Sequence, residues 1–164
     1  MGLIGFGRIA QAVAPIANAF GMKVVAWARN PTSELAARYG IEFVSLEALL
    51  NSSDVISLHL GLNEETDGIL SSSRLRSTKP GVVIVNTARQ QLLDEPTLIE
   101  LLGSGHIGAM ATDVFLKEPL PSEHAFREFD NVVMTPHNAY NTPEATAAMC
   151  DVAIKNLEAF FTEN

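Results

Sequence analysis

Short apolar runs alternate with segments that carry helix signals along almost the whole chain. The runs are rich in Val, Ile and Leu and have the length of strands buried on both faces of a parallel sheet. Helix signals lie between them: Thr32 or Ser33 as an N-cap, Pro96 in a first turn, and glycines at helix ends. The predicted strands cover residues 1–4, 22–28, 41–44, 54–60, 81–86, 107–113 and 132–134.

The alternation of strands and helices predicts an α/β fold, a Rossmann-type doubly wound parallel sheet with helices on both faces. The predicted helices cover residues 8–20, 33–39, 46–50, 95–102 and 143–160, with short helical pieces near 64–66 and 72–76. Residues 114–131 are predicted to form a long irregular loop, and the last helix is expected to be amphipathic. With no linker or internal repeat, we expect residues 1–164 to form one dinucleotide-binding domain.

The first turn carries the clearest binding signal. Gly5 permits a sharp turn, and Gly7 lacks the Cβ that would hold a phosphate away from the backbone. Ala10 is the small residue that lets the following helix pack against the strand. Glycine pairs are common in ordinary turns, but this pair follows a strand and opens a helix. We therefore expect a pyrophosphate at the helix N-terminus. The expected contacts are Gly5, Phe6, Gly7, Arg8 and Ile9.

The end of the second strand bears on the choice of coenzyme. Dinucleotide-binding folds specific for NAD place a carboxylate there for the adenosine ribose. This strand ends in Ala28, Arg29 and Asn30, with no carboxylate. Arg29 could pair with a 2′-phosphate and Asn30 could hydrogen-bond it, which favours NADP over NAD, although an exposed arginine is also common after a strand.

Four polar residues follow three neighbouring predicted strands. Arg89 follows the strand that ends at Asn86, Asp113 ends the next one, and His137 follows the last. Glu118 lies in the loop just after Asp113. Ligands of open parallel sheets bind at the carboxyl ends of the strands, so these side chains are expected at one edge.

Four motifs in register resemble the cofactor-binding domain of the D-isomer-specific 2-hydroxyacid dehydrogenases. The motifs are residues 86–89, 93–95, 112–121 and 131–137, and residues 57–60 and 156–160 extend the match over essentially the whole chain. The resemblance implies hydride transfer between a nicotinamide and C2 of a small 2-keto or 2-hydroxy acid. It also implies a homodimer.

The resemblance assigns roles to single residues. His137 matches the general acid/base, for which an imidazole is suited at neutral pH. Glu118 matches the carboxylate that orients this histidine, and Arg89 matches the residue that holds the substrate carboxylate. The family's cofactor contacts match His59, Leu60, Thr87, Ala88, Asp113 and His137.

Two departures from the family pattern change the expectation. Gln90 and Gln91 follow Arg89 where the family commonly has glycine. The family also builds its cleft from a second, substrate-binding domain, which we expect to be absent here. We therefore predict coenzyme binding with weak or no turnover. The alternative is a catalytically silent dinucleotide-binding module or sensor.

Composition limits the other possibilities. The net charge of −8 argues against a nucleic-acid partner. The single cysteine, Cys150, is expected to be a small core residue in a reducing, cytoplasmic compartment. No apolar run reaches the length of a membrane span, no signal peptide precedes the first strand, and no His, Cys or carboxylate spacing suggests a metal site.

Overall fold

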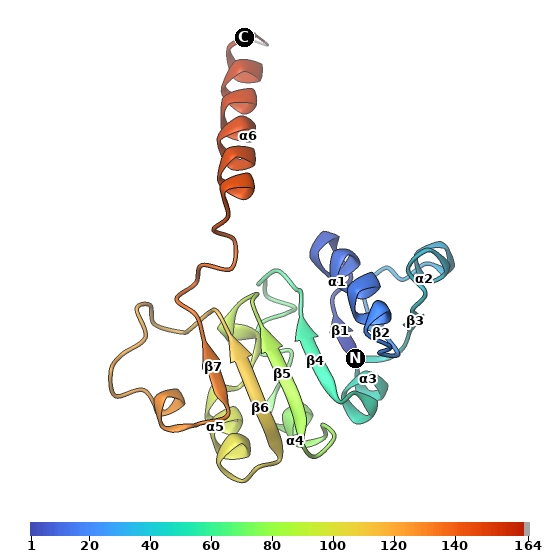
Figure 1. The fold of residues 1–164 in the computed structure, drawn as a ribbon, viewed down its shortest axis with the longest axis vertical. Helices are drawn as coiled ribbons and strands as arrows, with labels where there is room; N and C mark the ends of the chain where they lie inside the picture. Colours follow the sequence, from blue (N-terminus) through green and yellow to red (C-terminus); the bar gives the residue numbers. More distant parts are fainter. Residues whose placement is uncertain (163–164) are drawn as a thin grey trace.

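One parallel sheet organises the structure, a computed structural model that describes residues 1–162 (Figure 1). Within these residues the sheet has seven strands in the order β3-β2-β1-β4-β5-β6-β7. The strands are β1 (Gly2–Ile4), β2 (Val25–Trp27), β3 (Glu42–Phe43), β4 (Val55–Leu58), β5 (Val82–Asn86), β6 (Ile107–Thr112) and β7 (Val132–Met134). The predicted doubly wound Rossmann-type fold is confirmed.

Helices lie on both sides of the sheet, although on the α1 side none covers the strands β4 to β7, and Val133 of β7 is exposed there (Figure 1). The α-helices are α1 (Arg8–Ala19), α2 (Ser33–Tyr39), α3 (Leu46–Ser52), α4 (Ser72–Arg76), α5 (Glu95–Gly103) and α6 (Pro143–Thr162). Because adjacent strand residues point to opposite faces, Leu3 packs with α1 in one apolar cluster and Ile4 packs with α3, α4 and α5 in the other. All strands are parallel, and the order in which they are added reverses at β1: β2 and β3 lie on one side of β1, and β4 to β7 lie on the other.

Several local predictions differ from the structure. Residues 64–66 form a turn and no helix, because the side-chain oxygen of Asn63 accepts the N–H groups of Glu65 and Thr66. The second strand is shorter than predicted. The predicted loop 114–131 contains a short 3₁₀ helix, η2 (Ala125–Glu128), and a second one, η1 (Gln90–Leu92), follows Arg89.

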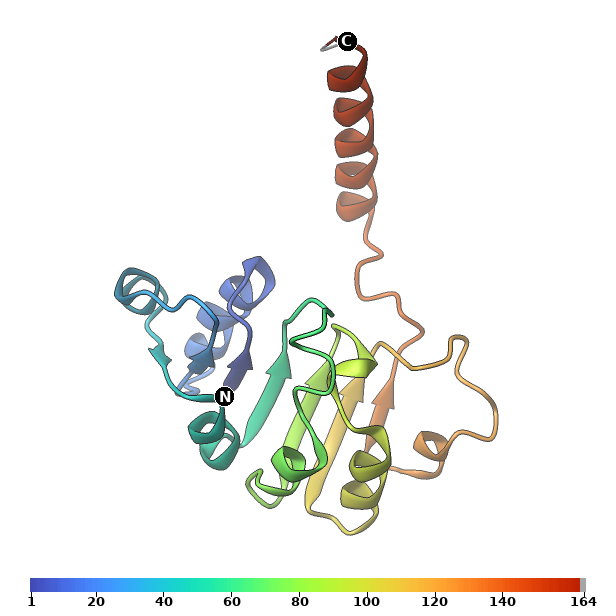
Figure 2. The same ribbon diagram turned by 180° about the vertical axis from the view of Figure 1, so that it is seen from behind.

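The last helix projects away from the sheet (Figures 1 and 2). No described residue of α6 is buried. The prediction that Cys150 is a core residue is therefore wrong, since its side chain is exposed on this helix. The helical assignment itself is confirmed, but a helix pattern does not reveal which surface the helix packs against.

The turn after β1 is fixed by its close approach to β4. The N–H of His59 donates to the carbonyl of Ile4 at 2.8 Å, and the N–H of Gly5 donates to the carbonyl of Trp27 at 2.9 Å. Gly5 has φ +91°, and a Cβ on it would lie 2.6 Å from the carbonyl oxygen of His59. Only glycine fits here without moving β4.

Replacing Gly5 by Ala is expected to destabilise the fold by about 2–4 kcal/mol, through backbone strain and overpacking. Gly7→Ala is the matched control, because a Cβ at Gly7 meets nothing within 4 Å and the change should cost less than about 1 kcal/mol. Chemical denaturation of the two variants measures both values. Equal losses of stability would contradict the packing argument.

Candidate active site

The N-terminus of α1 presents donors that the protein leaves without acceptors. Gly7 is the N-cap in an extended conformation, and no side chain caps the helix. The N–H groups of Arg8, Ile9 and Ala10 therefore have no intrahelical acceptor. The empty space beside Gly7 and these N–H groups fit a phosphate, and the helix dipole favours its charge.

A cleft of about 360 Å³ begins beside this turn. It runs between the start of α1, the end of β4 and the segment after β5. Six residues predicted as cofactor or substrate contacts line it together: Ile9, His59, Leu60, Thr87, Ala88 and Arg89. Sequence reasoning thus identified most of the cleft, and Leu58, Gly61 and Leu62 complete its lining.

His59 is held by the protein's own hydrogen bonds. Its backbone N–H donates to the carbonyl of Ile4, and its Nε2 lies 3.0 Å from the hydroxyl of Ser57. Burial lowers the pKa of the imidazole, which disfavours its charged form. The backbone N–H of His59 is therefore already used within the sheet, and its side chain contributes a neutral wall to the cleft.

The turn that carries Arg89 is braced by buried Asn86. The side-chain oxygen of Asn86 accepts the N–H of Ala88 at 3.0 Å, and its amide nitrogen donates to the carbonyl of Arg89 at 3.0 Å. Arg89 itself is exposed and donates from Nη1 to the carbonyl of Ala88. The guanidinium therefore retains donors for an anionic substrate at the rim of the cleft.

Asp113 organises the segment that carries His137. Its Oδ1 accepts the hydroxyl of Thr135 and the N–H of Asn138, and its Oδ2 accepts the N–H of Ala139. Burial opposes ionisation, but these hydrogen bonds outweigh it and lower the pKa of Asp113. Three of its roughly four acceptor positions are used within the protein, which leaves one for the expected cofactor contact.

His137 occupies a special backbone position. Among residues 1–162 it is the one non-glycine residue with positive φ, at 52°. The chain reverses there so that the next two N–H groups reach Asp113. The sharp turn directs the imidazole toward the loop after β6, where Glu118 lies.

His137 and Glu118 form the expected pair. His137 Nδ1 lies 2.8 Å from Glu118 Oε2, and Glu118 Oε1 accepts the N–H of Phe115 at 3.0 Å. The hydrogen bond from His137 and that from Phe115 lower the pKa of Glu118, so it is ionised at neutral pH. With Nδ1 facing Glu118, Nε2 is the nitrogen left for a substrate.

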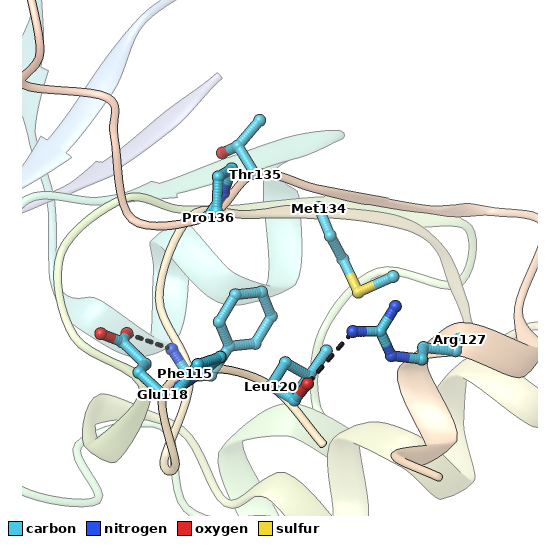
Figure 3. A pocket seen from close by; sticks show the side chains of 8 residues that line it. Phe115, Glu118, Leu120, Arg127, Met134, Thr135 and Pro136 are labelled. Carbon is cyan, nitrogen blue, oxygen red and sulfur yellow. Dashed lines mark hydrogen bonds between the residues drawn. The ribbon is translucent and has the colours of Figure 1, made fainter. Parts of the chain in front are cut away.

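A second cavity, of about 530 Å³, lies behind this pair. Figure 3 shows Glu118 and Arg127 on opposite sides of it, with Phe115 and Met134 between them. The guanidinium of Arg127 donates to the carbonyls of Leu120 and Pro121. This cation therefore holds the loop 114–131 and is not aimed at Glu118.

Arg29 has a partner that the sequence did not indicate. It pairs with Glu65, from the turn after β4, and both side chains are exposed. Together with Trp27 they line a pocket of about 330 Å³ at the carboxyl end of β2. The end of β2 itself carries no carboxylate, but Glu65 brings one beside Arg29 from a distant turn. Asn30 is exposed beside it.

A glycine turn, a cleft at the point where the strand order reverses and a His–Glu pair at the same sheet edge are features of a dinucleotide-binding domain. Residues 1–139 match the model of the D-isomer specific 2-hydroxyacid dehydrogenase, NAD binding domain. The chain belongs to this family, as the sequence motifs predict.

Several similar proteins agree with this assignment. A glyoxylate reductase of Aeropyrum pernix is 41% identical over 98% of this chain and 48% of its own length. A D-lactate dehydrogenase of Aquifex aeolicus, solved with NAD and lactic acid, superposes with a TM-score of 0.90 at 32% identity and covers 99% of this chain and 53% of its own. An acyclic imino acid reductase solved with NADPH and D-Arg superposes with a TM-score of 0.87 at 34% identity and covers 99% of this chain and 50% of its own. The chain thus spans about half the length of these relatives.

None of the helices in residues 1–162 has the length and apolar character needed to cross a bilayer.

The pKa of Glu118 is expected to rise toward its ordinary value of 4.5 in a His137→Ala variant, because the strongest donor to the carboxylate is lost. In the native chain this pair stabilises the fold above pH 4.5, and the contribution is lost as the pH falls through the lowered pKa. Carbon-detected NMR titration of the side-chain carboxyls measures the pKa of Glu118 in the native chain and in the variant. Glu123, held by its own N–H and by Ser122, is the internal reference. An unchanged Glu118 midpoint would show that the hydrogen bond is absent in solution.

Proposed function

We propose that the chain binds a nicotinamide dinucleotide along the cleft and provides the acid/base pair of a dehydrogenase for small 2-keto or 2-hydroxy acids. The observation that carries the proposal is the His137–Glu118 pair on the same sheet edge as the open glycine turn. The relatives named glyoxylate reductase and D-lactate dehydrogenase support this substrate class.

In the proposed function each side chain has a task. When bound, the coenzyme supplies or accepts the hydride. The guanidinium of Arg89 holds the substrate carboxylate through paired charge-assisted hydrogen bonds. His137 holds a proton on Nε2 and gives it to the carbonyl oxygen during reduction, and takes it back during oxidation. Glu118 fixes the orientation of the His137 ring through Nδ1.

The pyrophosphate position is proposed from the local donors of α1. Gly7 adds no side chain there, and the protein leaves the adjacent space open. Arg8 and Ile9 contribute the first N–H groups of the helix. Thr87 and Ala88 lie farther along the cleft, toward the predicted nicotinamide end.

The homodimer implied by the family stays a prediction. Exposed apolar residues on two helices support it, since such groups are usually covered in an assembly. They are Ile16 on α1, Phe20 at the C-cap of α1, and Met149, Val152, Ile154 and Leu157 on α6.

NADH and NADPH binding to the purified chain tests the proposed site. Titration followed by the fluorescence of Trp27, which lines the pocket beside Arg29, is expected to show saturable binding. Gly7→Ala should weaken it at least about ten-fold, equivalent to about 1.4 kcal/mol, because the new Cβ occupies the phosphate space. Equal affinity in this variant would refute the assigned pyrophosphate site.

Turnover assays separate an enzyme domain from a silent binding module. We expect weak or no reduction of glyoxylate and hydroxypyruvate by this chain, which spans about half the length of its relatives. In such reactions a second part of the protein closes over the site and excludes water. Any residual rate should be abolished in His137→Ala, with only a modest change in coenzyme affinity. A residual rate that does not depend on His137 would contradict the assigned acid/base role.

The pair between Arg29 and Glu65 bears on coenzyme choice. Arg29 is engaged by a carboxylate that would repel a 2′-phosphate, so Glu65→Gln should raise the affinity for NADPH relative to NADH about two- to five-fold. Glu64→Gln, which removes the same charge one residue away, is the control. Parallel titrations with the two coenzymes give the ratio, and an identical shift in both variants would indicate a general charge effect only.

A further inference from the structure

A buried polar cluster lies behind the cleft, outside the residues assigned to chemistry. The amide nitrogen of Gln90 donates to Glu95 Oε2 at 2.9 Å, and His124 Nε2 lies 3.2 Å from Glu95 Oε1. Gln90 is fully buried, and the side chains of Glu95 and His124 are only 12% and 19% exposed. Buried polar groups in a connected network of this kind restrict the positions of the segments that carry them.

The hydrogen bonds determine which nitrogen of His124 carries a proton. The backbone N–H of Phe126 donates to His124 Nδ1 at 3.2 Å, so Nδ1 must be an acceptor. Nε2 then carries the hydrogen and donates it to Glu95. The buried ring of Phe126 packs against the imidazole with 4.7 Å between centroids, which holds this orientation.

The cluster joins three separate segments of the chain. Gln90 directly follows Arg89 and opens η1, while Glu95 lies in the first turn of α5, where the helix dipole favours a carboxylate. His124 caps η2 in the same loop that carries Glu118. The side chain of Glu95, with one oxygen toward each neighbour, is the direct connection between the Arg89 turn and the Glu118 loop.

We infer that Gln90, Glu95 and His124 are positioning residues that hold the substrate-binding arginine and the acid/base pair at a fixed separation. This role rests on the proposed function, since it concerns the placement of Arg89 relative to Glu118 and His137. Asn86 braces the Arg89 turn from the sheet side, and Gln90 braces it from the side of the loop. The hydrogen bonds of Asn86 and Gln90 together fix the backbone on both sides of Arg89.

Amide hydrogen exchange in the coenzyme-free chain tests the coupling between the two segments. The Ala88 N–H, bonded to Asn86, reports on the Arg89 turn, and the Phe115 N–H, bonded to Glu118, reports on the other loop. Gln90→Ala and Glu95→Ala are each expected to speed exchange at both amides by about ten-fold. Gln91→Ala is the matched control, because Gln91 is exposed and it is Gln90 beside it that bonds Glu95. The amide of Ile84, in the middle of β5, monitors global unfolding.

A conservative variant and a spectroscopic signature separate positioning from general stability. In Glu95→Gln the new amide oxygen accepts from His124, and its NH₂ faces Gln90. The Gln90 Oε1, buried without a partner among the described residues, can accept it after a rotation of the Gln90 amide. Slow exchange should therefore be restored in this variant. Nitrogen-15 NMR should show His124 protonated at Nε2 in the native chain and a tautomer mixture in Glu95→Ala.

The outcomes distinguish this inference from the proposed function. If Gln90→Ala affects only its own turn, or Glu95→Gln behaves like Glu95→Ala, the coupling is refuted even in a chain that binds NADH. If the exchange results hold but neither coenzyme binds, the network stands as a structural link and its role in positioning for the reaction is refuted.

Discussion

The structure depends on the close contact between the glycine turn and the end of β4. Where Ile4 and His59 share a hydrogen bond, the backbones approach so closely that Gly5 cannot carry a side chain. This contact determines where α1 begins and in which direction its first N–H groups point. It also brings the start of α1 against the segment after β4, which together form one end of the cleft. The proposed phosphate position is therefore a consequence of backbone packing.

Carboxylates have two different roles in this domain, according to their burial. Asp113 and Glu95 are largely shielded from water and accept hydrogen bonds from several segments, so each organises a turn. Glu118 and Glu65 are partly or mostly exposed and each faces one basic side chain. A shielded carboxylate with several donors has one favourable geometry, whereas an exposed one can respond to a ligand. Structural support and the proposed chemistry thus fall to different acidic residues at the same sheet edge.

The sequence predicted the features that depend on local pattern. Buried strands have a composition of their own, and residues at their carboxyl ends must share an edge, so Arg89, Asp113 and His137 could be placed. Features that depend on tertiary contacts were missed. Glu65 reaches Arg29 across a turn set by Asn63, and His124 reaches Glu95 from a loop predicted to be irregular. Cys150 was misplaced because helical periodicity does not specify what a helix packs against.

The overall charge makes local donors essential to the proposed binding. A chain with a net charge of −8 repels dinucleotides and 2-keto acids at long range. At physiological ionic strength this repulsion is screened beyond about 8 Å, so the groups in direct contact determine affinity. The uncapped N–H groups of α1 and the guanidinium of Arg89 are such groups. Arg29 is another, but its charge is offset by Glu65. In the proposed binding mode an additional phosphate on the coenzyme would gain little from Arg29 unless that pair opens, so we propose that coenzyme choice depends on a contact between two surface side chains.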